Sequence, residues 1–471
     1  MKNLKALLRL LCLSVLVLQV GVTSAQIVNV SQTTGAATIN IPIYTLQRGK
    51  ISVPISLFYY GNGVKAKDIE GSAGMNWQIS AGGTITRELK DVPDDMADNS
   101  RGWLYNNNAS KISSFSIAND ANPGTCADEN ADQSYISANF NDLSDTEPDV
   151  FNIDLPGLSC KLVFDGNHQP KTIPYKDIKV SYTTDYIGIE HFKIISDKGI
   201  TYEFNTSELV NRKAFSANAS AIQFFKRKYQ VSQSVDFRRK WFLTSIKDND
   251  GNEVTFNYDK YNNYYRVGRK YFDFYIGNTT NKTNQFYVED GNYTYMLTGI
   301  DYVTDDVISG IPKFGFTYSY NAYTYMPLIQ SMYGLGRGWS FTYHEAWVPN
   351  VNYKRYFLKE FRETSEESLV RYHFDYNGLS AGSFNTVYST LPDSSSKQLD
   401  RWGYYNASTA TSLLPEVYIN PTTAGMERLR YEQIASLASN YPYSLSGNSR
   451  AINTTALISG SLSKVSLLDG G

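Results

Sequence analysis

Apolar and polar residues alternate along much of the chain, and this alternation predicts β-strands. Apolar side chains occupy every second position of residues 37–43 and again of 51–59, on either side of a turn at Gln47-Arg48-Gly49. A strand has a side-chain period of two, so each stretch places its apolar residues on one face of a sheet. The two stretches therefore predict an antiparallel hairpin that is buried on one face.

Short tracts with an aromatic ring at every second position recur further along. Their repetition indicates one structural unit that is used many times. The rings of each tract are expected on one face of a sheet. The tracts are Phe256/Tyr258, Phe316/Tyr318/Tyr320, Trp339/Phe341/Tyr343 and Tyr372/Phe374/Tyr376.

Other strands and turns follow from the same pattern and from Asp-Gly and Asn-Gly steps, which favour tight hairpins. A short helix is expected only at Glu432–Ala438. Residues from about 106 to 144 lack periodicity and predict a long loop. Strands are expected at Gly83–Leu89, Val150–Leu155, Lys161–Phe164, Ile200–Phe204, Trp241–Ile246 and Val254–Tyr258, with turns at Asp165-Gly166, Asp250-Gly251, Asp290-Gly291 and Asn377-Gly378.

The expected fold is all-β, with many antiparallel hairpins forming a large wound sheet and with little helix. The 37 Tyr and 23 Phe residues suffice to line such a sheet. No Pro- or Ser-rich linker divides the chain after residue 145. We therefore expect an N-terminal hairpin module at 26–105, a loop-rich insertion at 106–144 and a continuous sheet region at 145–471.

Residues 1–25 have the composition of a secretory signal peptide. Lys2, Lys5 and Arg9 precede a mostly apolar run at 10–22, and Thr23-Ser24-Ala25 offers small residues for cleavage. The alternative is an uncleaved membrane anchor, but a span needs about 20 apolar residues. We expect a secreted or cell-surface protein without a transmembrane span in the mature chain.

Charge argues against nucleic acid as the main partner. Removing the three basic residues of 1–25 from the 44 Lys and Arg leaves 41 against 46 Asp and Glu, a balance of −5. Nucleic-acid binding usually needs a basic surface. A local basic group is expected to be ordinary solvated surface. It comprises Lys226, Arg227, Lys228, Arg238, Arg239 and Lys240.

Cysteine and histidine usage gives no metal site. After signal cleavage Cys126 and Cys160 remain, and export makes a disulfide between them one alternative and two unpaired thiols the other. Two cysteines do not make a four-ligand zinc site. The four histidines (His168, His191, His344 and His373) show no metal-ligand spacing.

Two glycine-containing motifs resemble catalytic or phosphate-binding loops. Residues 378–382 match the G-x-S-x-G elbow around Ser380, but the residues after it are not helical and no histidine follows His373. The glycines of 334–338 precede a strand rather than the helix that a phosphate loop needs. Both segments are predicted to be turns.

Two acidic segments are also weighed. Residues 248–253 have the composition of a calcium loop, but Ile246 and Asn257 would stand at the first and last ligand positions, so a hairpin turn is favoured. Glu147 and Asp149 flank Pro148 with no sign of a substrate pocket, and a structural role is expected. No catalytic, cofactor or metal residue is assigned, no cofactor is expected, and the protein is not expected to be an enzyme.

Several sequence blocks, in order, resemble the N-terminal region of bacterial Rhs/YD-repeat proteins. Any one block would be weak, whereas their shared order over most of the mature chain is specific. Ala407 departs from the glycine of the family pattern. The blocks lie at Gly35–Leu57, Gly74–Trp77, Ala81–Arg87, Asp145–Phe151, Trp241–Ile246 with Asp250–Glu253, Trp402–Asn406 and Gly460–Val465.

This resemblance implies a role in a hollow β-shell. Members of the family wind long sheets into shells, many of which are polymorphic toxin carriers, and relatives mediate cell-surface contact. The implied partners are the remainder of the shell or a C-terminal effector, with cell-surface glycans or proteins as alternatives. Leu468-Asp469 departs from the family pattern near the C-terminus, and no full run of repeats or effector domain is recognised.

A non-enzymatic exported scaffold is therefore the expected function. It would form the N-terminal part of a shell that supports effector encapsulation and delivery or cell-surface contact. The chain resembles a fragment of a longer shell protein, and self-association through an open sheet edge is expected. A carbohydrate-binding or adhesion module that uses exposed rings is the alternative, and a hydrolase ranks last.

Overall fold

The computed structural model describes strands in four antiparallel sheets and one short helix. The expected all-β fold, rich in hairpins and poor in helix, is confirmed. The structure describes residues 28–30, 36–90, 92–97, 100–108, 145–216, 234–261, 265–274, 284–302, 313–320, 326–348, 353–364, 370–379, 391, 393, 396–410, 416–419, 443–446 and 451–468.

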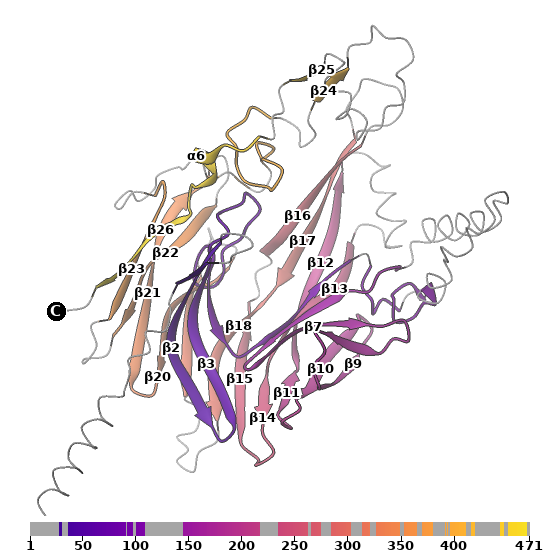
Figure 1. The fold of residues 1–471 in the computed structure, drawn as a ribbon, viewed down its shortest axis with the longest axis vertical. Coiled ribbons are helices and arrows are strands. Elements are labelled where there is room, and N and C mark those ends of the chain that lie inside the picture. The colour runs from indigo at the N-terminus through magenta and orange to yellow at the C-terminus, as the bar shows by residue number, and fades with distance from the viewer. Residues whose placement is uncertain are drawn as a thin grey trace, which may run out of the picture.

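The largest sheet has 12 strands, and most neighbours in it are consecutive hairpin strands (Figure 1). Their order is β26 (Leu462–Leu468), β23 (Arg371–Tyr376), β22 (Lys354–Glu363), β21 (Arg337–Trp347), β20 (Leu328–Gly334), β19 (Phe314–Ser319), β18 (Tyr295–Tyr302), β15 (Glu253–Lys260), β14 (Ser245–Lys247), β11 (Thr201–Phe204), β10 (Ile189–Ile195) and β9 (Lys179–Thr184).

A second sheet has eight strands and exchanges chain segments with the first. The chain leaves the large sheet after β11, forms a pair of strands in the second sheet and returns at β14. The order is β16 (Tyr265–Phe274), β17 (Asn284–Tyr293), β12 (Thr206–Ser216), β13 (Ser234–Phe242), β5 (Thr84–Glu88), β6 (Val150–Leu155), β7 (Leu158–Phe164) and β8 (Pro170–Ile173).

The N-terminal segment forms a small sheet, and the predicted hairpin is confirmed in it. Ile39, Ile41, Val53, Ile55 and the other apolar residues of one face are buried. The sheet has the order β1 (Val28–Val30), β2 (Ala37–Arg48), β3 (Ile51–Tyr60) and β4 (Trp77–Ala81). A separate two-stranded sheet consists of β24 (Glu416–Ile419) and β25 (Tyr443–Ser446), and the described helix is α6 (Thr454–Leu457).

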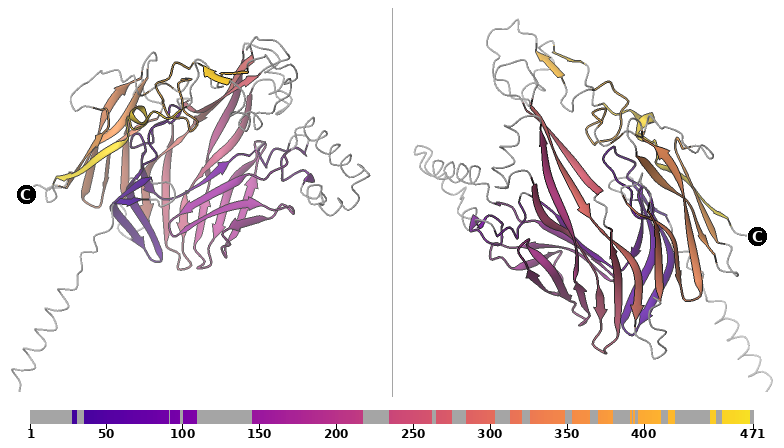
Figure 2. Two further views of the ribbon diagram at one scale, coloured as in Figure 1. Left: turned by 45° about the horizontal axis from the view of Figure 1, so that its top comes forward. Right: turned by 180° about the vertical axis from the view of Figure 1, so that it is seen from behind.

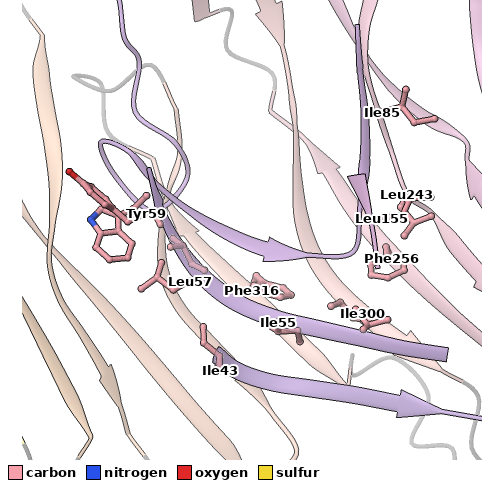
Figure 3. Close-up of a cluster of buried hydrophobic side chains, with 14 of the residues drawn as sticks. Ile43, Ile55, Leu57, Tyr59, Ile85, Leu155, Leu243, Phe256, Ile300 and Phe316 are labelled. Carbon is pink, nitrogen blue, oxygen red and sulfur yellow. The ribbon is translucent and has the colours of Figure 1, made fainter. Parts of the chain in front are cut away.

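The N-terminal sheet packs against the large sheet, and the views of Figure 2 show the strands forming a curved wall. In Figure 3, Ile43, Ile55 and Leu57 of the N-terminal hairpin lie beside Phe316 and Ile300 of the large sheet. One hydrophobic cluster contains buried residues from the N-terminal sheet, the eight-stranded sheet and the 12-stranded sheet. The apolar face of the hairpin therefore supplies the inner layer of the core.

Three local predictions need correction. The strand expected at Trp241–Ile246 is divided, because Phe242 ends β13 in the eight-stranded sheet and Ser245 begins β14 in the large sheet. The strand at Gly83–Leu89, expected as the third strand after the N-terminal hairpin, exists as β5, but it joins the eight-stranded sheet, and β4 is the strand that pairs with β3. The switch occurs at Gly82, whose φ is +86° and where a Cβ would lie 2.9 Å from the Phe256 ring. Glycine is needed there because an L side chain would be strained and would collide.

Another correction concerns Asp290-Gly291, where the sequence predicts a turn. It lies within β17, where Asp290 faces Arg212 on one side and Gly268 on the other, next to a β-bulge between Arg266 and Gly268. An Asp-Gly step thus occurs inside a strand because a bulge in the neighbouring strand accommodates it. The turns at Asp165, Gly251 and Gly378 are confirmed.

Some predictions fall on residues that the structure does not describe. These are the signal peptide at 1–25, the helix at Glu432–Ala438 and most of the insertion at 106–144. Asn106 and Asn108, at its start, are described and buried, and both donate hydrogen bonds to the Asp145 carbonyl oxygen, at 2.9 and 2.5 Å. The two ends of that segment are therefore joined at their base.

Candidate functional site

A row of tyrosine hydroxyls crosses the large sheet, and each bonds to a carbonyl oxygen of the neighbouring strand. Tyr318 Oη donates to Leu297 O at 2.8 Å, and Tyr343 Oη donates to Ile329 O at 2.6 Å. We call this row the tyrosine ladder. Its complete set is Tyr258 to Leu243, Tyr318 to Leu297, Tyr343 to Ile329 and Tyr376 to Leu358.

Each ladder tyrosine also stands at a β-bulge toward the strand on its other side. The register shifts between Thr317 and Tyr318, and likewise just before the other three tyrosines. A bulge re-aims a side chain and increases the local twist. The extra residue of each bulge lies in the strand on that other side, at Thr298, Gln330, Lys359 and Ser463, so the same irregularity recurs in every unit.

The ladder connects strand to strand without interruption from β14 to β26. Leu297 accepts the Tyr318 hydroxyl and faces Tyr258 across the bulge. Ile329 and Leu358 combine the same two roles in the following pairs. One hairpin unit is therefore repeated, although loops of very different length separate its copies.

Burial keeps these hydroxyls protonated. Desolvation raises the pKa of each of the four tyrosines above the ordinary value of 10.0. A neutral hydroxyl is the form that donates to a carbonyl oxygen. The ladder is therefore maintained across the physiological pH range.

The aromatic tracts of the sequence coincide with the donor half of this unit. Phe256, Phe316, Phe341 and Phe374 are buried two residues before each tyrosine. The acceptor half was missed by sequence reasoning. Its signal is a Leu or Ile followed three residues later by a buried apolar residue: Leu243/Ile246, Leu297/Ile300, Ile329/Met332 and Leu358/Phe361.

The N-terminal sheet closes one end of the ladder. Trp77 Nε1 donates to Tyr376 Oη at 2.9 Å, and its ring lies 4.6 Å from Phe374. The backbone N–H of Leu462 donates to Tyr59 Oη at 3.2 Å. Residues separated by about 300 or more positions thus meet, and the N-terminal segment fixes the last strands of the sheet.

A buried arginine secures the same contact. Arg355, on β22, is 1% exposed and donates to the carbonyl oxygens of Lys65, Ala66 and Asp68 at 3.3, 2.8 and 3.3 Å. Buried charges are tolerated when such hydrogen bonds satisfy them. The loop between β3 and β4 is therefore tied to the large sheet by main-chain acceptors.

A second buried cluster joins the eight-stranded sheet to the start of β10. Arg87 Nη2 lies 2.8 Å from Asp95 Oδ2, and Arg87 Nε lies 3.5 Å from Asp149 Oδ2. Asp95 also accepts the Ile189 N–H at 2.5 Å. The guanidinium stacks over the Phe151 and Trp241 rings at 4.9 and 5.3 Å. This geometry ties β5 to the start of β10 and leaves the carboxylates of Asp95 and Asp149 buried.

Two carboxyl groups of this cluster, those of Asp94 and Asp149, have raised pKa values. Burial and the neighbouring Asp149 carboxylate raise the pKa of Asp94 to about 9. Burial likewise raises the pKa of Asp149. Glu147 is exposed whereas Asp149 is buried, so the two do not form an acid–base pair on one face.

The basic group of the sequence is only partly described. Arg238 is not solvated surface as predicted: it is 8% exposed and forms a two-pronged contact of 2.6 Å per bond with Asp185. Lys240 packs over the Phe242 ring at 4.9 Å, and burial lowers its pKa. Arg238 and Lys240 flank a β-bulge at Arg239 in the pairing of β13 with β12. Lys226, Arg227 and Lys228 lie outside the described residues.

The structure places two of the glycine-containing and acidic motifs in turns. Leu335 and Gly336, with φ of +51° and +77°, form the β20–β21 turn, and Asp248–Glu253 forms the β14–β15 turn, as predicted. Ser380 lies outside the described residues. Within the described part of the chain no group of His, Cys, Asp or Glu is suited to hold a metal ion. The same part contains no helix that is long and apolar enough to span a membrane.

The cysteine prediction stays open. Cys160 lies in β7 opposite Ile153 and is 7% exposed. Burial raises the pKa of its thiol. Cys126 lies outside the described residues, so the disulfide between Cys126 and Cys160 remains a prediction.

Comparisons with known proteins give only a distant likeness of fold. No protein-family model and no curated protein matches the chain. Solved structures that match include the crystal structure of TcdB2-TccC3-TEV, with 12% identity and a TM-score of 0.36 over 77% of this chain. They also include the Photorhabdus luminescens Tc holotoxin pore with the mutation TccC3-D651A, with 11% identity and a TM-score of 0.35 over 73% of this chain.

The N-terminal domain of the effector SpvB from Salmonella typhimurium strain LT2 matches at 10% identity and a TM-score of 0.27, covering 72% of this chain and 93% of that domain. The chain spans 17% and 16% of the two Tc toxin chains. At these TM-scores the likeness supports no argument about function.

Proposed function

We propose that the chain is a non-enzymatic, exported scaffold that forms the N-terminal part of an Rhs/YD-like β-shell. The tyrosine ladder is the observation that supports this most directly, because it repeats one hairpin unit across a single wide sheet. In this proposal the rings of the ladder serve register and packing.

The proposed role of the N-terminal sheet is to start the shell and to close one end of it. The contacts of Tyr59, Trp77 and Arg355 support this role because they tie the N-terminal segment to β26, β23 and β22, respectively. In this proposal the shell encloses or delivers an effector or mediates cell-surface contact. Its partners are the remainder of the shell or a C-terminal effector, and export proceeds through residues 1–25.

Sequencing the DNA that follows codon 471 tests the proposal. We expect further alternating aromatic strands, encoded in the same reading frame or in an adjacent one. Unrelated coding sequence directly after this codon, with no such strands nearby, would contradict a shell. This test does not require the isolated chain to be soluble or monomeric.

Adhesion through exposed rings is the second candidate. Tyr175, Tyr186 and Trp402 are 82%, 94% and 61% exposed. They stand on separate loops rather than along one strand, which favours isolated surface rings over a sugar platform. A glycan array should show no saturable binding; saturable binding that is lost in Trp402→Ala would favour adhesion.

A hydrolase is the last-ranked alternative. Esterase activity that is lost in Ser380→Ala would favour it.

A further inference from the structure

Donor and acceptor strands alternate strictly in the part of the large sheet that runs from β14 to β23. The strands β15, β19, β21 and β23 carry the ladder tyrosines. The carbonyl acceptors come from the segment leading into β14 and from β18, β20 and β22. Each acceptor strand lies between two donor strands, except at the end of the row.

The register between an acceptor strand and the donor that bonds to it is the same in every unit. The apolar residue three positions after the acceptor always faces the residue two positions before the phenylalanine. Register is set where one face is buried, because a slip of one residue would turn every ring outward. The pairs are Ile246 with Val254, Ile300 with Phe314, Met332 with Trp339 and Phe361 with Tyr372.

The outermost strand, β26, has the features of an acceptor strand. Leu462 faces Tyr376 across a bulge, as Leu297, Ile329 and Leu358 face their tyrosines. Val465 stands three positions later and packs on the same core. In the described part of the sheet β23 is the sole strand paired with β26. Leu467 and Leu468 are 49% and 44% exposed.

We infer that the free edge of β26 is a docking site for an extended strand with an apolar-x-Phe-x-Tyr pattern. The tyrosine hydroxyl of that strand donates to Leu462 O, and its first apolar residue faces Val465. This inference deepens the proposed scaffold function, because it names the chemistry of the segment that the sheet recruits. Strand addition of this kind combines main-chain hydrogen bonds with pockets for alternate side chains.

The opposite edge of the same sheet differs in kind. The strand β9 runs Lys-Val-Ser-Tyr-Thr-Thr, and Lys179, Thr183 and Thr184 are exposed on it. It lacks a Leu or Ile with an apolar residue three positions later. Exposed polar and charged side chains protect an edge from pairing. The incoming strand therefore selects β26 over β9.

A peptide that copies residues 370–379 provides the probe, because it contains Tyr372, Phe374 and Tyr376 in the required spacing. Binding to the purified chain is measured by fluorescence anisotropy. The matched control peptide carries Tyr376→Phe, which removes the hydroxyl and keeps the ring. We expect the control to bind about fivefold to tenfold more weakly, as the loss of one buried hydrogen bond implies.

Disulfide trapping tests the register. If peptide Tyr372 faces Val465, peptide residue 373 faces Lys464. A peptide with His373→Cys should therefore crosslink to the Lys464→Cys chain. It should crosslink far less to the Ser466→Cys chain, whose substituted position lies two residues away on the same face of β26. The chain without an added cysteine and a chain with Ser181→Cys on β9 are the controls.

Equal binding of the Tyr and Phe peptides, or equal crosslinking at Lys464 and Ser466, would overturn the inference. Disulfide-linked dimers of Lys464→Cys chains formed despite excess peptide would also overturn it, because a second copy would then be the occupant. A peptide that fails to bind, although the downstream DNA encodes aromatic strands, refutes this inference alone. Missing downstream strands would contradict the proposed function and leave the peptide result unaffected.

Discussion

The hydroxyl group of a ladder tyrosine performs a task that its ring does not. Rings at alternate positions bury apolar area whichever neighbouring strand they face. The hydrogen bond from Tyr318 to Leu297, in contrast, forms in one register only. The ring thus contributes to stability, whereas the hydroxyl contributes to the choice of partner and register.

Replacing Tyr318 by Phe should lower the free energy of unfolding by about 1–2 kcal/mol, because the Leu297 carbonyl loses a buried donor. Tyr320→Phe is the matched control, since Tyr320 lies two residues later and is 62% exposed. Urea unfolding followed by fluorescence measures both variants. Equal midpoints for the two would show that the hydroxyl does not stabilise the sheet.

Asp94 predicts a pH dependence. Its folded pKa, about 9, lies above the ordinary 3.8, so the folded state keeps a proton that the unfolded state releases between these values. Its contribution to stability is therefore fully present below about pH 4 and declines as the pH rises toward 9. The groups that face it are Asp149, Arg87 and Asp145.

Asp94→Asn should flatten this decline, because an amide stays neutral at every pH. The measurement is the urea midpoint at several pH values from 5 to 9 for the wild type and the variant. Asp177→Asn, a substitution at an exposed position, should retain the wild-type slope. A slope that is unchanged in Asp94→Asn would contradict the neutral, buried state of this carboxyl group.

Hairpins were the elements that the sequence predicted best. Alternation located the strands, and Asp-Gly or Asn-Gly steps located most turns, since these residues adopt the conformations that tight turns need. The error at Asp290-Gly291 arose because a bulge lets such a step remain inside a strand. Bulges depend on the partner strand, so one segment read alone does not reveal them.

The β20–β21 turn offers a test of this turn chemistry. Leu335 and Gly336 both have positive φ, the geometry of a type I′ turn. Leu335→Asn should stabilise the protein by about 0.5–1 kcal/mol, since Asn tolerates this conformation better than Leu. Gly336→Ala should destabilise it by about 1 kcal/mol. Thermal unfolding midpoints that shift in the same direction would contradict the assigned turn.

The sheet order and the contacts between distant segments lay beyond sequence reasoning. The aromatic tracts predicted the donor half of the ladder, but an acceptor is a main-chain carbonyl, and its only side-chain signal is a Leu or Ile with an apolar residue three positions later, which becomes recognisable once the strands are paired. The burial of Arg87 and Arg238 was missed for a related reason: their carboxylate partners, Asp95 and Asp185, are close only in the folded chain. Local periodicity does not show which distant residue neutralises a charge.

The N-terminal sheet should stabilise strands that are distant in sequence. Trp77→Phe removes the hydrogen bond to Tyr376 and part of the packing on Phe374, at a cost of about 1–3 kcal/mol. Hydrogen exchange should then accelerate in β23 and β26. Trp402→Phe is the control, because Trp402 is 61% exposed. Faster exchange confined to β3 and β4 would contradict the coupling.

The central claim is that the repeated tyrosines face inward and bond from strand to strand, and nitration of tyrosines read by mass spectrometry tests it most directly. We predict that Tyr258, Tyr318, Tyr343 and Tyr376 resist tetranitromethane in the native chain, whereas Tyr175 and Tyr186, at 82% and 94% exposure, react readily. Nitration of the ladder tyrosines at the rate of the exposed pair would contradict the account.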